Sequence, residues 1–220
     1  MLPRLPSIEA DKRAVIAGRT GSGKTTLACW LLGRSRQHWI IFNPKHTKGY
    51  NNLEGAETLR SFVPGRVDSS IMRNRFTIIN FPGSEADADF MDDCVNYLHQ
   101  SYNNIGLCAD ELYTLHSAGG RQGPGLTGWL TRGRELKQSF LGLTQRPAFV
   151  SRFLFSEADY IGGMNLTTKE DRKRMYEHTG QERFERPLQP RHWLWYDVGR
   201  DQLDHWQPVP IHKTGVSEHG

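Results

Sequence analysis

The sequence has few cysteines, no long apolar run and no histidine spacing of a metal-binding motif. Its three cysteines, Cys29, Cys94 and Cys108, lie far apart, which fits neither a zinc site nor a disulfide framework and suits a reducing cytoplasm. No run approaches the roughly 20 apolar residues of a membrane span. Residues 1–12 lack the apolar segment of a secretory signal. The nine histidines include no H-E-x-x-H pattern, so we predict no metal site other than one for Mg²⁺.

Length and charge bear on the number of domains and on the possible partners. A chain of 220 residues, 37% of them hydrophobic, can build one core and fits one domain, or one domain with a small appendage. The net charge of +4 makes the chain mildly basic. This charge permits a polyanionic partner but does not require one, because many solvated surfaces give the same sum.

Residues 18–25, Gly-Arg-Thr-Gly-Ser-Gly-Lys-Thr, match the phosphate-loop pattern G-x-x-x-x-G-K-[ST] at every position. The apolar segment Ala14–Ala17 before it predicts a buried strand, and residues 26–33 predict a helix. A glycine-rich turn between a strand and a helix directs successive N–H groups into one concavity, at the positive end of the helix dipole. We expect Lys24 to reach the β- and γ-phosphates of ATP and the Thr25 hydroxyl to hold Mg²⁺. The predicted nucleotide contacts are Gly18, Arg19, Thr20, Gly21, Ser22, Gly23, Lys24, Thr25 and Thr26.

Strand and helix patterns alternate along most of the chain. We expect strands at 14–17, 39–42, 76–81, 105–109, 140–144 and 160–164, and a terminal hairpin from 193–198 and 202–209. We expect helices at 26–33, 58–63, 84–102, 126–138, 147–158 and 168–178. Residues 45–58 otherwise look irregular. The pattern predicts an α/β fold of the RecA-like P-loop type, with a mostly parallel sheet covered by helices on both faces.

The expected domain organisation is simple. Residues 1–12 form an N-terminal arm on the surface, and residues 13–211 form the P-loop domain, which includes the terminal hairpin at 192–209. Residues 212–220 form a flexible tail.

Two further strand ends carry polar side chains suited to ATP hydrolysis. The strand at 105–109 leads into Asp110 and Glu111, where the aspartate can support Mg²⁺ and the glutamate can deprotonate the attacking water. The strand at 140–144 leads into Gln145, whose amide could lie beside the γ-phosphate. A solvated polar strand end is the alternative for each, although the phosphate loop favours the functional interpretation of the carboxylates.

Arg134 lies eleven residues before Gln145, within Thr-Arg-Gly-Arg-Glu. An arginine at this place could reach a phosphate across a subunit interface and stabilise the transition-state charge. A solvated helix face, with Arg134 paired to Glu135 or to another carboxylate, is the more common outcome for such a residue.

Taken together, the loop at 18–25, the pair Asp110-Glu111, and Arg134 followed by Thr-Gln-Arg-Pro at 144–147 resemble the FtsK/HerA superfamily of DNA-pumping ATPases. The resemblance covers about residues 12–165. The short chain, without long accessory domains, is most similar to the genome-packaging ATPases of tailless, membrane-containing icosahedral viruses of the tectivirus type. It departs from the family at residues 43–45, Asn-Pro-Lys, where relatives often have Asp-Pro-Lys, and this leaves the roles of Asn43 and Lys45 open.

The resemblance implies a role for each matching residue. Lys24 and Thr25 would contact phosphate and Mg²⁺, Asp110 would support the metal, and Glu111 would be the catalytic carboxylate. Gln145 would be the polar sensor. Arg134 would be the finger that acts in a neighbouring subunit, with Arg132 as the alternative.

The resemblance also implies partners and a location. They are a homo-oligomeric ring, most often a hexamer, and double-stranded DNA bound without sequence preference. A capsid vertex or viral membrane protein is a further candidate partner, and the location would be the packaging vertex of the virion and the host cytoplasm. Two loops are candidates for the DNA channel, the glycine-rich loop with Arg121 and the loop with Lys45, Lys48 and Tyr50, although a merely solvated loop is the more common outcome for each.

Other functions share part of these features. A small-molecule or nucleotide kinase would use the same phosphate loop and Mg²⁺ without a ring, but Glu111 and Gln145 favour hydrolysis. A cellular or plasmid DNA pump of the same superfamily differs mainly in length. A non-catalytic DNA-binding protein with a vestigial phosphate loop is disfavoured because Lys24, Thr25, Asp110 and Glu111 are all present.

Overall fold

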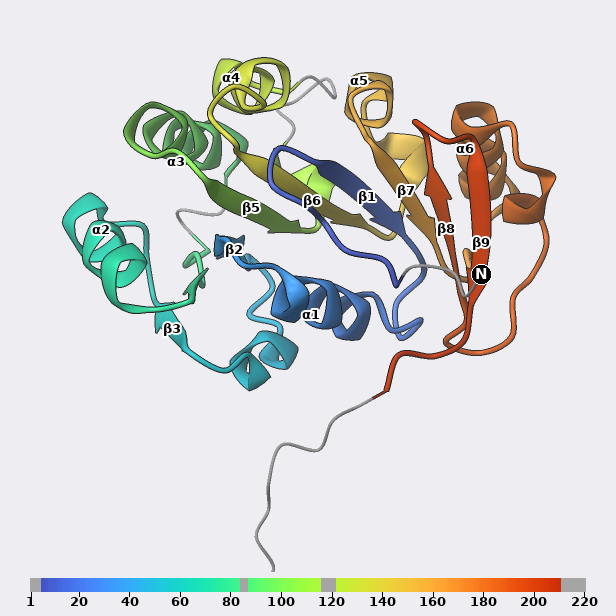
Figure 1. Cartoon of the computed structure of the whole chain (residues 1–220), viewed down its shortest axis with the longest axis horizontal. Coiled ribbons are helices and arrows are strands. Elements are labelled where there is room, and N and C mark those ends of the chain that lie inside the picture. Colours follow the sequence, from blue (N-terminus) through green and yellow to red (C-terminus); the bar gives the residue numbers. More distant parts are fainter. Residues whose placement is uncertain (1–4, 84–86, 116–121, 211–220) are drawn as a thin grey trace, which may run out of the picture.

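The computed structural model describes residues 5–83, 87–115 and 122–210, which form a nine-stranded sheet between two layers of helices (Figure 1). The strands are β1 (Arg13–Ala17), β2 (His38–Phe42), β3 (Ala56–Leu59), β4 (Phe76–Ile79), β5 (Ile105–Asp110), β6 (Ser139–Thr144), β7 (Tyr160–Gly163), β8 (Trp193–Asp197) and β9 (Gln202–Trp206). The α-helices are α1 (Lys24–Arg34), α2 (Pro64–Arg73), α3 (Ala88–Ser101), α4 (Pro124–Arg132), α5 (Arg152–Ser156) and α6 (Lys169–Thr179). Short 3₁₀ turns are η1 (Lys48–Asn52), η2 (Leu112–Leu115), η3 (Pro147–Phe149) and η4 (Glu182–Glu185).

The sheet order is β3-β4-β2-β5-β6-β1-β7-β8-β9. Strands from β3 to β7 pair in parallel, whereas β7–β8 and β8–β9 pair antiparallel. β6 lies between β1 and β5, so the segment after Thr144 lies between the phosphate loop and the segment after Asp110. The predicted α/β fold with a mostly parallel sheet and a terminal hairpin is confirmed.

The central strands are apolar because helices cover both faces of the sheet. β1, β5 and β6 are buried along their whole length, as expected for parallel strands inside two helical layers. Helices α3 to α6 lie on one face and α1 on the other (Figure 1). Two hydrophobic clusters fill these layers, one containing Val15 and Leu98 and the other Ile16 and Leu31.

The secondary structure differs from the prediction at several places. The helix predicted at 58–63 is wrong, because Ala56–Leu59 is an edge strand and the helix begins only at Pro64. The helix predicted at 126–138 ends at Arg132, and the one predicted at 147–158 is broken between Phe149 and Arg152.

The structure describes only part of the predicted arm. Pro6 and Ile8 are buried, so the described part of the arm packs into the core and does not simply lie on the surface. The tail at 212–220 and the start of the helix predicted at Ser84 lie outside the described residues; the helix described there begins at Ala88, capped by Asp87. The domain boundaries remain a prediction. Within residues 5–83, 87–115 and 122–210, no helix has the length and apolar character needed to cross a membrane.

Candidate active site

The phosphate loop lies between β1 and α1 and is fixed to both strands next to β1. The Gly18 N–H donates to the Thr144 carbonyl at 3.0 Å, and the Arg19 N–H donates to the Asn165 carbonyl at 2.7 Å. Gly23 caps α1 with φ 105°, a backbone conformation that favours glycine. A Cβ on Gly18 would come within 2.7 Å of the Ser22 hydroxyl, so this position has no room for a side chain.

Lys24 points back across the loop. Its Nζ donates to the carbonyls of Gly18 at 2.6 Å and Arg19 at 3.1 Å, and the residue is only 9% exposed. Burial lowers the pKa of Lys24, although the nearby Glu111 and Asp110 raise it in part. The ammonium therefore lies within the concavity of the loop, where phosphate oxygens could take over its hydrogen bonds.

The two carboxylates that follow β5 differ in their surroundings. Burial raises the pKa of Asp110, while a hydrogen bond from the Thr47 hydroxyl acts in the opposite direction. Glu111 is 3% exposed and has φ 95°, a strained conformation for a glutamate. Thr114 holds this conformation, because its hydroxyl donates to the Glu111 carbonyl at 2.8 Å.

Gln145 connects the phosphate loop to Glu111. Its Nε2 donates to Glu111 Oε2 at 2.8 Å, and its backbone N–H donates to Oε1 at 3.3 Å. Its side-chain oxygen accepts a hydrogen bond from the Thr20 hydroxyl. The sheet order explains this bridge, because β6 places Gln145 between the strands that carry the other two groups.

Lys45 is a site residue whose role the sequence left open. Its Nζ forms an ion pair with Glu111 Oε2 at 2.5 Å. Burial lowers the pKa of Lys45, but the hydrogen bond and charge of Glu111 outweigh it, so the pKa is raised overall. The turn that carries Lys45 is held by Asn43, whose Oδ1 accepts from the Thr47 N–H at 2.8 Å. The signal was the position of Asn-Pro-Lys at the carboxyl end of β2, which pairs with β5.

A cavity of about 450 Å³ runs along the phosphate loop. Its lining residues are Thr20, Gly21, Gly23, Lys24, Thr25, Thr26, Leu27, Lys45, Thr47, Asp110, Gln145, Met164, Arg191, Trp193, Pro208 and Val209. Most predicted contacts thus face one cavity. Gly18, Arg19, Ser22 and Glu111 do not line it, and Glu111 reaches it through Lys45 and Gln145.

The donor set at this cavity fits Mg²⁺. The Thr25 hydroxyl and the Asp110 carboxylate supply oxygen atoms, which Mg²⁺ prefers. Among the described residues, no cluster of three or more His, Cys, Asp or Glu could hold a metal by itself. A Mg²⁺ ion here would therefore share its ligands with a phosphate-bearing substrate, as is usual for this ion.

Arg134 lies near the amino-terminal end of β6, whereas this cavity lies at the carboxyl ends of the strands. It precedes β6, whereas Gln145 follows it, and the six residues of β6 span roughly 20 Å at about 3.3 Å per residue. Its Nη1 donates to Asp159 Oδ1 at 3.1 Å, and its side chain is 45% exposed. The structure therefore does not bring Arg134 to the site of its own chain, and a role in a neighbouring chain stays a prediction, as does the alternative role of Arg132.

The two loops proposed for a DNA channel have different outcomes. Arg121 lies outside the described residues. Tyr50 is fully buried and cannot line a channel, and Lys45 is bound to Glu111. Of the second loop, only Lys48 keeps an exposed side chain free for such a role in the described structure.

Asp110→Asn should raise the melting temperature of the protein measured without nucleotide at pH 7. The folded-state pKa of Asp110 lies above its value of 3.8 in the unfolded chain. Its ionisation therefore lowers stability as the pH rises through that window, and the asparagine removes this cost. A gain of about 1 kcal/mol would correspond to about 2–4 °C in a chain of this size.

The gain from Asp110→Asn should shrink as the pH is lowered, because the wild-type carboxyl then becomes protonated. Asp159→Asn is the matched control. Asp159 accepts hydrogen bonds from Lys12, Arg134 and the Arg13 N–H, so its substitution should lower the melting temperature. Calorimetry between pH 4 and pH 8 measures both effects. A lower melting temperature for Asp110→Asn at pH 7 would contradict the assignment of burial as the dominant effect.

Known proteins resemble this chain in both sequence and structure. It is 27% identical over 215 residues to the DNA packaging ATPase P9 of Enterobacteria phage PRD1, covering 90% of this chain and 88% of that protein. It superposes on the genome packaging NTPase B204 of Sulfolobus turreted icosahedral virus 2, solved with ATP-γS, with a TM-score of 0.75, 18% identity, and coverage of 91% and 99%. For VirB4 of Thermoanaerobacter pseudethanolicus the TM-score is 0.66, with 11% identity and coverage of 91% and 90%. No family model matches the chain. These similarities confirm the resemblance that the motifs predicted.

Proposed function

We propose that this chain is a genome-packaging ATPase of the FtsK/HerA superfamily, which hydrolyses ATP to move double-stranded DNA into a capsid. The observation that carries the proposal is the bridge from Thr20 through Gln145 to Glu111. This bridge joins a phosphate loop to a buried carboxylate, which is the arrangement that cleavage of a terminal phosphate requires. The similarity to the DNA packaging ATPase P9 and to the genome packaging NTPase B204, which was solved with ATP-γS and with AMPPCP, supports the proposal.

Each residue of the site has a part in this reaction. The loop N–H groups and Lys24 bind the β- and γ-phosphates. Thr25 and Asp110 would hold Mg²⁺, which would supply charge neutralisation at the phosphates. Glu111 accepts the proton of the attacking water. Gln145 is the polar sensor, because it contacts both Thr20 of the phosphate loop and Glu111 and so links the bound nucleotide to the base. In the structure the Glu111 carboxylate is held by Lys45 and Gln145, both of which line the cavity.

The active assembly is a ring, most often a hexamer in this superfamily. Arg134 enters the site of the adjacent protomer, because its own site lies at the other end of β6. The cargo is duplex DNA gripped by its phosphates, which carry no sequence information. The glycine-rich loop with Arg121 and the loop with Lys48 are the candidates for the contacts. A capsid vertex or viral membrane protein docks the ring, in the virion and in the host cytoplasm.

Duplex DNA should stimulate ATP hydrolysis, and salt should abolish the stimulation. If six or more phosphates are contacted, DNA affinity should fall by about 10³-fold or more between 50 and 200 mM salt. The measurement is phosphate release with and without duplexes of unrelated sequence over that salt range. Lys24→Ala should bind DNA but release no phosphate.

Two results would redirect the interpretation. Transfer of the γ-phosphate to a nucleotide or small molecule in place of water would identify a kinase. DNA binding by a wild-type protein that releases no phosphate would identify a non-catalytic protein with a vestigial phosphate loop.

A further inference from the structure

The cavity continues past the phosphate loop to a wall made by the C-terminal part of the chain. Met164, Arg191, Trp193, Pro208 and Val209 line the cavity, together with Lys24, Lys45, Asp110 and Gln145. The first set is mostly apolar with one cation, and the second is charged and polar. A triphosphate bound by the second set would leave its nucleoside to the first set.

The aromatic side chains of the hairpin fix this wall against the helix that follows the phosphate loop. The Trp193 ring packs edge-on against Trp30 of α1, with centroids 6.2 Å apart, and stacks on Trp206 at 5.8 Å. The Trp193 indole N–H donates to the Gln207 carbonyl at 2.9 Å, directly before Pro208. The wall is therefore held at a set position relative to α1.

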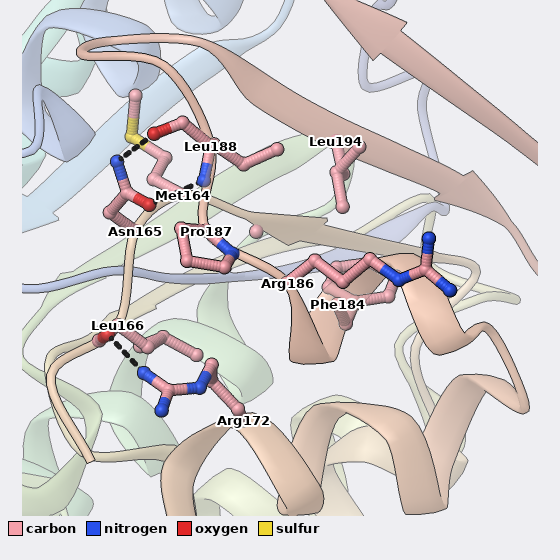
Figure 2. Close-up of a pocket in the computed structure, with 10 residues that line it drawn as sticks. Met164, Asn165, Leu166, Arg172, Phe184, Arg186, Pro187, Leu188 and Leu194 are labelled. Carbon is pink, nitrogen blue, oxygen red and sulfur yellow. Dashed lines mark hydrogen bonds between the residues drawn. The ribbon is translucent and has the colours of Figure 1, made fainter. Parts of the chain in front are cut away.

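Asn165 ties the same wall to the phosphate loop, and Figure 2 shows its side-chain contacts with Leu188. Its backbone carbonyl accepts from the Arg19 N–H at 2.7 Å. Its side-chain amide makes two hydrogen bonds to the backbone of Leu188, each 2.7 Å long. The preceding Met164 accepts a hydrogen bond from the Ser22 hydroxyl through its sulfur at 3.7 Å. Residues 164 and 165 thus hold the loop on one side and the segment leading to Arg191 on the other.

We propose that the segment from 188 to 209 is the nucleoside-binding half of the site, and that it takes the base of a purine nucleoside triphosphate. The base lies against Pro208, Val209 and Met164, and the planar guanidinium of Arg191 stacks on its face. Apolar side chains with one stacking arginine suit a flat heterocycle. The proposal rests on the proposed function, because it assigns the other half of the same nucleotide.

The backbone at Arg191 supports a fixed placement of its side chain. Its φ is 63°, in the left-handed region. The chain turns sharply here, between the Leu188 clamp and β8, and this turn places Arg191 at the cavity. Lys137 adopts a similar φ of 53° in the same protein, so a lysine at 191 can keep this backbone.

Inorganic tripolyphosphate separates the two halves of the site, because it carries the phosphates without a base. Arg191→Lys keeps the charge but removes the planar stacking face, and Val209→Ala removes apolar contact. Each should raise the Kd for ATP by about 3–5-fold and the double variant by about 10–20-fold, if the two effects add. The Kd for tripolyphosphate should stay within about twofold. Titration calorimetry on the full chain measures both ligands.

Arg200→Lys is the matched control, since Arg200 lies at the turn between β8 and β9 and pairs with Asp197. It should change neither Kd. ATP and GTP should bind more tightly than CTP, because a purine covers more of the apolar wall. Equal losses for ATP and tripolyphosphate, or no loss for ATP in the double variant, would overturn the proposal.

The failure of the proposed function looks different in the same experiment. Lys24→Ala should lose both ligands. A wild-type protein that binds ATP through this wall but never releases phosphate would contradict the proposed ATPase activity and still support the nucleoside pocket. A wild-type protein that binds neither ATP nor tripolyphosphate would contradict both proposals.

Discussion

Glu111→Gln should reduce ATP hydrolysis by about 10³-fold, within the range of about 10²–10⁴ that general-base catalysis contributes, while ATP still binds. The glutamine has the same shape and can accept a hydrogen bond from Gln145, but it cannot take a proton from water. The phosphate loop and Lys24 are untouched, so the Kd for ATP should stay within a few-fold. Single-turnover phosphate release and titration calorimetry measure the two quantities separately.

Glu54→Gln is the control for this substitution, since Glu54 lies exposed in the turn before β3. It should leave hydrolysis unchanged. Retention of more than about one tenth of the wild-type rate in Glu111→Gln would exclude Glu111 as the base, because removal of a general base has a larger effect. Asp110 would then be the next candidate, as the other buried carboxylate beside the cavity.

Arg134→Ala should lower the rate of ATP hydrolysis by about 10³-fold in the assembled protein, the loss typical of an arginine finger. The change should leave ATP binding to the isolated chain intact, because Arg134 precedes β6 and its own phosphate loop lies at the other end of that strand. Mixing Arg134→Ala with Glu111→Gln subunits should restore activity. In a ring of random composition, about a quarter of the interfaces combine an intact Glu111 with an intact neighbouring Arg134.

The controls for Arg134→Ala come from its surroundings. Lys12 forms an ion pair with the same carboxylate, Asp159, at 3.3 Å. If Arg134→Ala acted only by freeing Asp159, then Lys12→Ala should be equally inactive, whereas we expect it to be nearly as active as wild type. Arg132→Ala tests the alternative finger. Absence of recovery in mixed rings whose assembly is verified by light scattering would argue against a shared site.

The sequence predicted the centre of the fold well, for a physical reason. Parallel strands buried on both faces are short apolar runs, and β1, β2, β5 and β6 could be located from such runs within one or two residues. β3 was missed because Ala-Glu-Thr-Leu is an edge strand with an exposed threonine, and nothing local distinguishes it from a turn. Its pairing with β4, not its own composition, makes it a strand.

The site divides along a similar line. The residues of contiguous motifs, from Gly18 to Thr26 and Asp110 to Glu111, could be placed from sequence because their spacing follows the chemistry. The contacts of Lys45 with Glu111 and of Asn165 with the phosphate loop could not. They depend on which strand ends become neighbours, and that order is a property of the whole sheet.

The ion pair between Lys45 and Glu111 restrains the catalytic carboxylate by default. The Lys45 ammonium lies 2.5 Å from Glu111 Oε2, an oxygen that the Gln145 amide also contacts. ATP bound to such a chain would not be hydrolysed until a rearrangement separates Lys45 from Glu111. An ATPase restrained in this way hydrolyses little ATP when no DNA is bound, and Lys45→Met should raise the rate of hydrolysis without DNA.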